Sequence, residues 1–123
     1  MIVLDEQLRD AQIRREFARW YKGTITTIND LRPRTRILDD VVPTLLRTVN
    51  APTFVTINYA DYWRKIAANR NYCVVCLRLE QDEALRAPQL TREVLSLPQY
   101  RTKRARMGAV ISVRGHTVAD YRA

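Results

Sequence analysis

Short apolar runs that alternate with helix-patterned segments constrain the fold of this chain more than any other feature. Ile2–Leu4 and Thr53–Thr56 are too short for helical periodicity and favour strands. The same criterion predicts further strands, including a short terminal one, over residues 24–28, 73–79, 109–113 and 117–121. A turn at Arg114 and Gly115 is expected to join the last two strands.

Segments with helical spacing of apolar residues lie between these strands: residues 6–21, 37–49, 58–67 and 90–106. Gly23 follows the first of them as a stop signal, and Asn58 is placed to cap the third. Asp39 and Asp40 lie in the first turn of the second, where they favour the helix dipole. A kink is expected at Pro98 in the fourth, and the polar residues 81–88 predict a loop.

Alternating strands and helices predict an α/β fold. We expect a three-layer sandwich with a mostly parallel central sheet of about five strands, flanked by helices and joined by right-handed crossovers. The 123 residues suffice for one domain, expected to span residues 1–123, and exclude an enzyme with separate substrate and cofactor domains. Ligands of such sheets bind beyond the carboxyl ends of the strands, so that edge is where a site is expected.

The charge of the chain favours a polyanionic partner. Its formal net charge is +8, and 18 of the 21 basic residues are Arg. The planar guanidinium suits phosphate oxygens, which indicates RNA or DNA. An acidic partner protein would also be attracted by this positive charge.

The remaining chemistry-bearing residues narrow the class of protein. Cys73 and Cys76 lie three residues apart in an expected strand, roughly 10 Å from each other and on opposite faces, so we expect reduced core thiols. His116 is the only histidine and has no nucleophile partner, and no phosphate-binding glycine loop occurs. No apolar stretch reaches the roughly 20 residues of a membrane span, and no signal peptide is visible, so a cytoplasmic protein is expected.

Several carboxylates follow the expected strands. Asp5 and Glu6 come directly after the first strand, Asp30 follows the second and Asp61 the third, while Asp39 and Asp40 open the helix between them. Clustered carboxylates repel one another unless a cation offsets them, and Mg²⁺ and Mn²⁺ prefer such oxygen ligands. Taken singly, each acid also suits a helix start or a turn.

The order of these acids resembles that of PIN-domain ribonucleases. The opening Ile2–Leu4 followed by Asp5 is similar to their first strand and first acid. Asp40 and then Thr56-Ile-Asn58-Tyr-Ala-Asp61-Tyr62 resemble the helix-opening Asp and the Thr-x-Asn-x-x-Asp-Phe strand end of toxin-type PIN domains. The second acid of the family has no counterpart at a matching position, so Glu6 or Asp30 would stand in.

The resemblance implies a compact PIN-like domain whose Asp5, Asp40 and Asp61, with Glu6, hold Mg²⁺ or Mn²⁺. Thr56 and Asn58 would shape the strand end that presents Asp61. The implied function is a metal-dependent endoribonuclease, the toxin of a toxin-antitoxin pair, with an antitoxin protein and a homodimer as implied partners. Arginines near the same edge would guide the RNA backbone: Arg9, Arg32, Arg34, Arg36 and Arg64.

Two other function classes stay open at the level of sequence. One is a catalytically degenerate PIN-like module that binds RNA or a partner protein. The other is a phosphoacceptor α/β domain, which would need a Lys near a late strand end, where Lys103 is out of context.

Overall fold

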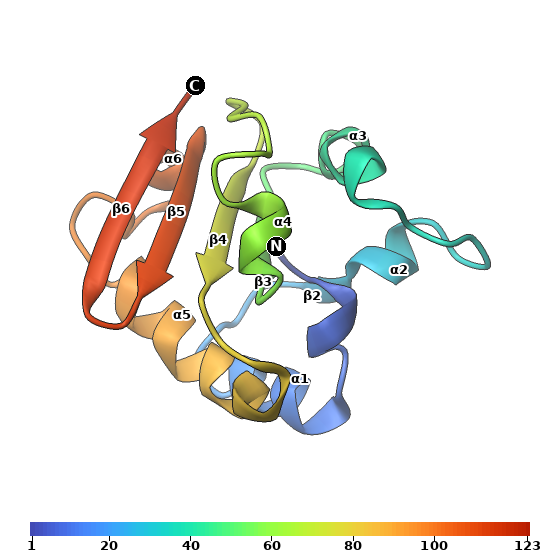
Figure 1. Cartoon of the computed structure of the whole chain (residues 1–123), viewed down its shortest axis with the longest axis horizontal. Helices are drawn as coiled ribbons and strands as arrows, with labels where there is room; N and C mark the ends of the chain where they lie inside the picture. The colour runs from blue at the N-terminus through green and yellow to red at the C-terminus, as the bar shows by residue number, and fades with distance from the viewer.

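The chain forms one six-stranded sheet with helices on both faces, as described by a computed structural model of residues 1–123 (Figure 1). The strands are β1 (Ile2–Leu4), β2 (Ile25–Thr27), β3 (Thr53–Thr56), β4 (Cys73–Leu77), β5 (Ala109–Arg114) and β6 (Thr117–Arg122). Their order is β2-β1-β3-β4-β5-β6, and every neighbouring pair is parallel except the antiparallel β5 and β6. The α/β class and the mostly parallel sheet predicted from sequence are confirmed.

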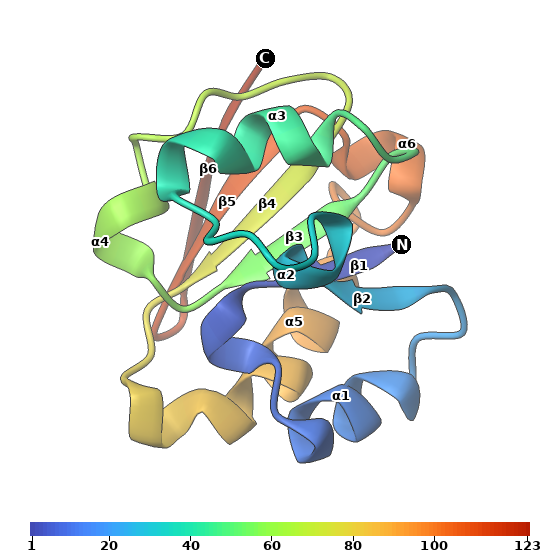
Figure 2. The same cartoon turned by 90° about the vertical axis from the view of Figure 1, so that its right-hand side faces the viewer.

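Two layers of short helices cover the sheet (Figure 2). One face carries η1 (Glu6–Leu8), α1 (Ala11–Ala18), η3 (Gln81–Arg86) and α5 (Ala87–Leu95). The other face carries α2 (Ile28–Leu31), η2 (Asp39–Val41), α3 (Val42–Leu46) and α4 (Tyr59–Tyr62). The short α6 (Lys103–Arg106) precedes β5. None of these helices is long and apolar enough to cross a membrane.

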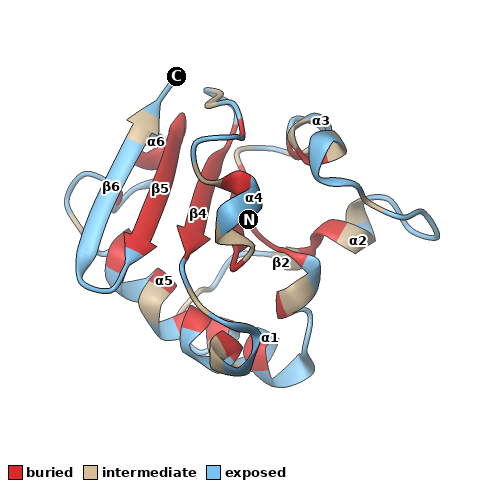
Figure 3. Cartoon of the chain, viewed as in Figure 1, coloured by how far each residue is buried: buried red, intermediate tan, exposed pale blue.

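The core is divided by the alternation of side chains along each strand. Ile2 and Leu4 belong to the core under α1 and α5, whereas Val3 belongs to the core under α3. Cys73 likewise belongs to the core under α1 and α5, and Cys76 to the core under α3. Both are free, buried thiols, as predicted. Because both faces are covered, β1, β3 and β4 are buried throughout. Figure 3 shows this for β4.

Helix boundaries differ from the sequence expectation where a cap or a proline intervenes. The expected helix 6–21 is two pieces, because Asp10 accepts a hydrogen bond from the Gln12 amide at 2.7 Å and starts α1 afresh. The expected helix 90–106 is also two, α5 and α6, with Pro98 in the connection. The expected loop 81–88 is mostly helical, because Glu80 and Glu83 form a capping box that starts η3. Pro88 then lies in the first turn of α5, where proline is tolerated.

The elements beside the carboxyl edge are shorter than predicted. The expected strand 24–28 ends at Thr27, whose hydroxyl accepts a hydrogen bond from the Asp30 amide and begins α2. The expected helix 37–49 is limited to η2 and α3, and α4 ends at Tyr62, well before residue 67. Asn58 precedes α4 as expected, but its side chain makes no capping bond.

The last two strands form the predicted hairpin. Gly115 in its turn has a φ of 60°, a left-handed conformation that glycine adopts without strain. β6 lies at the edge of the sheet and is largely exposed (Figure 3).

Candidate functional site

The strand order creates a switch point between β1 and β3. From β1 the chain moves to β2 on one side, and it then crosses to β3 on the other side of β1. In doubly wound sheets of this order, ligands bind at the carboxyl ends of the two strands that flank the switch point. Asp5 directly follows β1 and Thr56 ends β3, so both residues lie at this place.

Asp5 is held there as a buried carboxylate. It is 6% exposed, and its Oδ2 accepts a hydrogen bond from Thr56 Oγ1 at 2.6 Å. Its Oδ1 accepts one from the Glu6 amide at 2.8 Å. The Thr56 hydroxyl in turn accepts a hydrogen bond from the Asn58 amide at 2.9 Å. These contacts fix the orientation of the Asp5 carboxylate.

The environment makes this carboxylate costly to ionise. Burial raises the pKa of Asp5, and the nearby charges of Asp39 and Glu6 raise it further. The hydrogen bonds from Thr56 and the Glu6 amide oppose that shift. A raised pKa on a carboxyl group in a pocket is a frequent property of functional acids.

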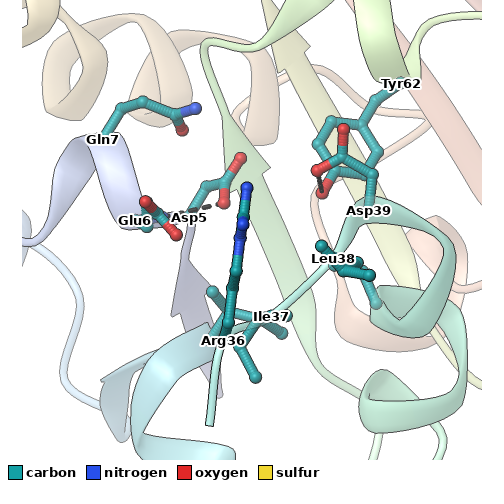
Figure 4. Close-up of a pocket in the computed structure, with 10 residues that line it drawn as sticks. Asp5, Glu6, Gln7, Arg36, Ile37, Leu38, Asp39 and Tyr62 are labelled. Carbon is teal, nitrogen blue, oxygen red and sulfur yellow. Dashed lines mark hydrogen bonds between the residues drawn. The ribbon is translucent and has the colours of Figure 1, made fainter.

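Asp5 faces a pocket of about 280 Å³ that contains three carboxylates, those of Asp5, Glu6 and Asp39 (Figure 4). Arg36 points into the same pocket. The rest of the wall is largely apolar: Gln7, Ile28, Ile37, Leu38, Val42 and Tyr62. The acids of the pocket thus come from two segments: Asp5 and Glu6 follow β1, and Asp39 begins η2. Arg36 is the one cation among them.

Tyr62 positions Asp39 at the far side of this pocket. Its hydroxyl donates a hydrogen bond to Asp39 Oδ1 at 3.0 Å, and its ring packs edge-on against Phe54 with 5.5 Å between centroids. Burial raises the pKa of Tyr62, and the charges of Asp5 and Asp39 raise it further. The hydroxyl therefore stays protonated and acts as a donor.

The structure assembles a different acid set from the one carried over by resemblance. Asp5 and Glu6 line the pocket, but Asp40 and Asp61 are exposed and do not. Asp39, the neighbour of Asp40, lines the pocket across from Asp5. Asp30 is also exposed and lies outside the pocket. Thr56 supports Asp5 rather than Asp61, and Asn58 contributes its backbone amide.

The arginines expected to guide RNA separate in the structure. Arg36 alone lines the acid pocket, while Arg9, Arg32, Arg34 and Arg64 are exposed and lie outside it. Arg34 and Arg64 have φ values of 63° and 62°, a left-handed backbone that costs free energy for residues other than glycine. Arg64 also lies over the Trp63 ring, 5.6 Å from its centroid.

The pocket matches a hard cation in the chemistry of its donors. Carboxylate oxygens are the ligands that Mg²⁺ and Mn²⁺ prefer. No three of the His, Cys, Asp and Glu side chains are grouped to hold a metal ion as they stand. Glu6 and Asp39 are exposed, whereas Asp5 is buried and Asp39 accepts the hydrogen bond from Tyr62.

The sequence named Asp39 among the carboxylates at this edge but gave the metal-binding role to Asp40, and it assigned no role in the site to Tyr62. Asp39 stood in the expected first helical turn beside Asp40, and periodicity alone does not separate the two. Tyr62 stood in the resembled motif, where a Phe would only pack. Comparisons with protein-family models, with curated proteins and with solved structures gave no match.

Proposed function

We propose that this protein is a metal-dependent phosphodiesterase of PIN-like type that cleaves RNA in the pocket between β1 and β3. The observation that carries the proposal is the buried Asp5 carboxylate, fixed at the switch point and sharing one pocket with Glu6 and Asp39. Burying a carboxylate costs free energy, and a site that needs its charge explains why it is kept there.

The residues of the pocket would have different roles in such a reaction. Asp5, Glu6 and Asp39 would hold the ion, with Asp5 as the fixed member because Thr56 and the Glu6 amide orient it. A bound Mg²⁺ or Mn²⁺ would supply an activated water and stabilise charge on the scissile phosphate. Arg36, which lines the pocket, would donate hydrogen bonds to phosphate oxygens, and Tyr62 would orient Asp39.

The biological role in this proposal is the toxin of a toxin-antitoxin pair. A chain with a formal net charge of +8 attracts RNA, and an acidic antitoxin would compensate the same charge. The cytoplasm, where RNA is the substrate, is the location that this role requires.

The experiment is Mn²⁺ titration by calorimetry of the wild type and four single variants. Asp5→Asn and Asp39→Asn remove charges of the pocket, whereas Asp40→Asn and Asp61→Asn remove the same charge outside it. We expect wild-type binding that is lost in the first pair and retained in the second. Cleavage of a mixed RNA pool should follow the same pattern and stop with EDTA.

The second candidate is a non-catalytic module that binds RNA. One observation favours it: no three acidic side chains are grouped to hold a metal ion as they stand. Under this alternative, RNA binds without Mn²⁺, stays intact, and is bound equally by Asp5→Asn and the wild type. Absence of Mn²⁺ binding at millimolar concentration together with retained RNA binding would replace the nuclease proposal by this one.

A further inference from the structure

A second pocket lies at the other end of the strands from Asp5. Its volume is about 730 Å³, and four arginines line it together with two aromatic residues: Arg19, Arg92, Arg101, Arg106, Trp20 and Tyr21. No acidic residue lines it. Arg106 Nε donates a hydrogen bond to Thr53, the first residue of β3, whereas Asp5 follows the last residue of the parallel β1. The two pockets therefore open at opposite ends of the strands.

The arginines of this pocket are poorly neutralised by the protein. Three ion pairs occur in the structure, and only one, between Arg19 and Glu16 at 3.5 Å, includes an arginine of the pocket. Arg92, Arg101 and Arg106 pair with no carboxylate. Cations gathered in one cavity repel one another unless an anion offsets them. Arg19, Arg92 and Arg101 are exposed and Arg106 is buried, so the pocket presents an excess of positive charge that suits a negative ligand.

Arg106 is the fixed member of the group. It is 7% exposed and is held by Thr53 Oγ1 at 3.0 Å and by the Tyr100 carbonyl at 3.2 Å. These bonds use Nε and Nη1, and no protein acceptor is paired with Nη2. A buried guanidinium without a carboxylate is costly, and it supplies a pre-oriented donor for an oxyanion.

Local packing shapes the aromatic part of the wall. A Cβ on Gly23 would lie 2.7 Å from the Tyr21 hydroxyl, so glycine at this position leaves room for the Tyr21 ring. The Trp20 ring packs against Phe17 and Tyr21, with centroid separations of 5.8 and 6.0 Å. Flat aromatic walls beside cations are suited to nucleobases, which stack on them while arginines take the phosphates.

We propose that this basic pocket binds the phosphate groups of a nucleotide, either free or as part of an RNA strand. Four guanidinium groups offer enough donors for two phosphates, because each planar fork can contact phosphate oxygens in bidentate fashion. The volume lies within the range of roughly 300–1,000 Å³ that is usual for small-molecule sites. The proposal is independent of the acid pocket and of any metal.

Calorimetry at low salt in the presence of EDTA tests this site separately from the metal site. The probes are inorganic pyrophosphate, ADP, adenosine and a short single-stranded RNA. Arg92→Gln and Arg101→Gln each remove a charge that makes no hydrogen bond or ion pair within the protein. The control is Arg15→Gln, an equal loss of charge on an exposed position of α1 outside the pocket.

We expect ADP and pyrophosphate to bind and adenosine to bind at least 10-fold more weakly. Combining Arg92→Gln and Arg101→Gln should weaken the binding of both phosphate ligands at least 10-fold, whereas Arg15→Gln should change it less than 2-fold. Binding of RNA alone, with the same dependence on the two variants, would support the proposal and identify the strand as the source of the phosphate.

Three outcomes would overturn the proposal. The first is no binding of ADP, pyrophosphate or RNA at millimolar concentration. The second is binding that Arg15→Gln weakens as much as the pocket variants do, because general charge attraction then explains it. The third is adenosine binding as tightly as ADP. Circular dichroism of each variant verifies that it is folded, so a loss of binding is not a loss of structure.

Discussion

At the scale of single residues, the Thr56 hydroxyl links the two strands that form the switch point. It donates to the buried Asp5 carboxylate at 2.6 Å and accepts from the Asn58 amide at 2.9 Å. Thr56 itself is fully buried, and both hydrogen bonds of its hydroxyl are made within the protein. One side chain therefore holds both the candidate functional acid and the start of the segment that leads to α4.

Thr56→Val should consequently destabilise the protein well beyond a typical surface substitution. Valine keeps the shape but leaves the Asp5 oxygen and the Asn58 amide without this partner, at a cost of roughly 1–3 kcal/mol for each unsatisfied group. Urea denaturation measures the change in the free energy of unfolding. Thr56→Ser, which keeps the hydroxyl, is the matched control. Equal stabilities of the Val and Ser variants would show that these bonds contribute nothing.

At the scale of elements, short helices with local caps replace the longer helices that periodicity suggests. Asp5 caps η1 and Asp10 caps α1, so Arg9 and Asp10 separate two helices within one apolar pattern. Thr27 caps α2 and Thr102 caps α6 in the same manner. The break before α1 turns Ile13 and Phe17 toward the core while η1 directs Leu8 toward it.

Asp10→Ala tests the cap of α1. The side chain accepts from the Gln12 amide at 2.7 Å and is exposed, so its removal should lower the free energy of unfolding by about 1 kcal/mol. Asp10→Asn keeps the acceptor and should lie within a few tenths of a kcal/mol of the wild type. Thermal and urea denaturation both report the difference. An alanine variant as stable as the asparagine variant would contradict the capping role.

At the scale of the whole molecule, the sheet separates two kinds of charge. Carboxylates gather at the carboxyl ends of β1 and β3, and arginines gather near the amino end of β3. Between them the core is apolar and contains groups that titrate only at high pH. Burial raises the pKa of Cys73 to about 12 and that of Cys76 to about 12. Burial likewise raises the pKa of Tyr121 to about 12.

These shifts predict a loss of stability in alkali. The folded-state pKa of each thiol lies above the unfolded value of about 9, so the unfolded chain releases these protons first as the pH rises. The contribution of each thiol to the free energy of unfolding is fully present below about pH 9. It is lost as the pH rises toward 12, at about 1.4 kcal/mol per thiol and pH unit.

Urea denaturation between pH 8 and pH 10 measures this loss. The two thiols together should lower the free energy of unfolding by roughly 3 kcal/mol, with a smaller part from tyrosines. The double variant Cys73→Ala, Cys76→Ala removes the thiol part and should show a flatter pH profile, whatever its stability at pH 8. Parallel profiles for the two proteins would contradict the assignment.

Much of the architecture was predictable because it depends on local pattern. Apolar runs such as Ile2–Leu4 and Thr53–Thr56 must be buried on both faces, and both are strands as expected. Asp5 at the end of β1 also follows from sequence. The choice between Asp39 and Asp40 does not, because adjacent residues at a helix start differ only in the direction that tertiary packing gives them.

The sequence by itself determined the α/β class, the strands, the burial of the two cysteines as free thiols and the position of Asp5, since each depends on residues a few places apart. The tertiary structure alone decided which exposed side chains share a cavity. It placed Asp39 in one pocket with Asp5, and it brought Arg19, which follows α1, together with Arg92 of α5 and Arg106 of α6 in another. Such groupings depend on how helices rotate and pack on the sheet, and charges at their surfaces have no periodic pattern that records the outcome.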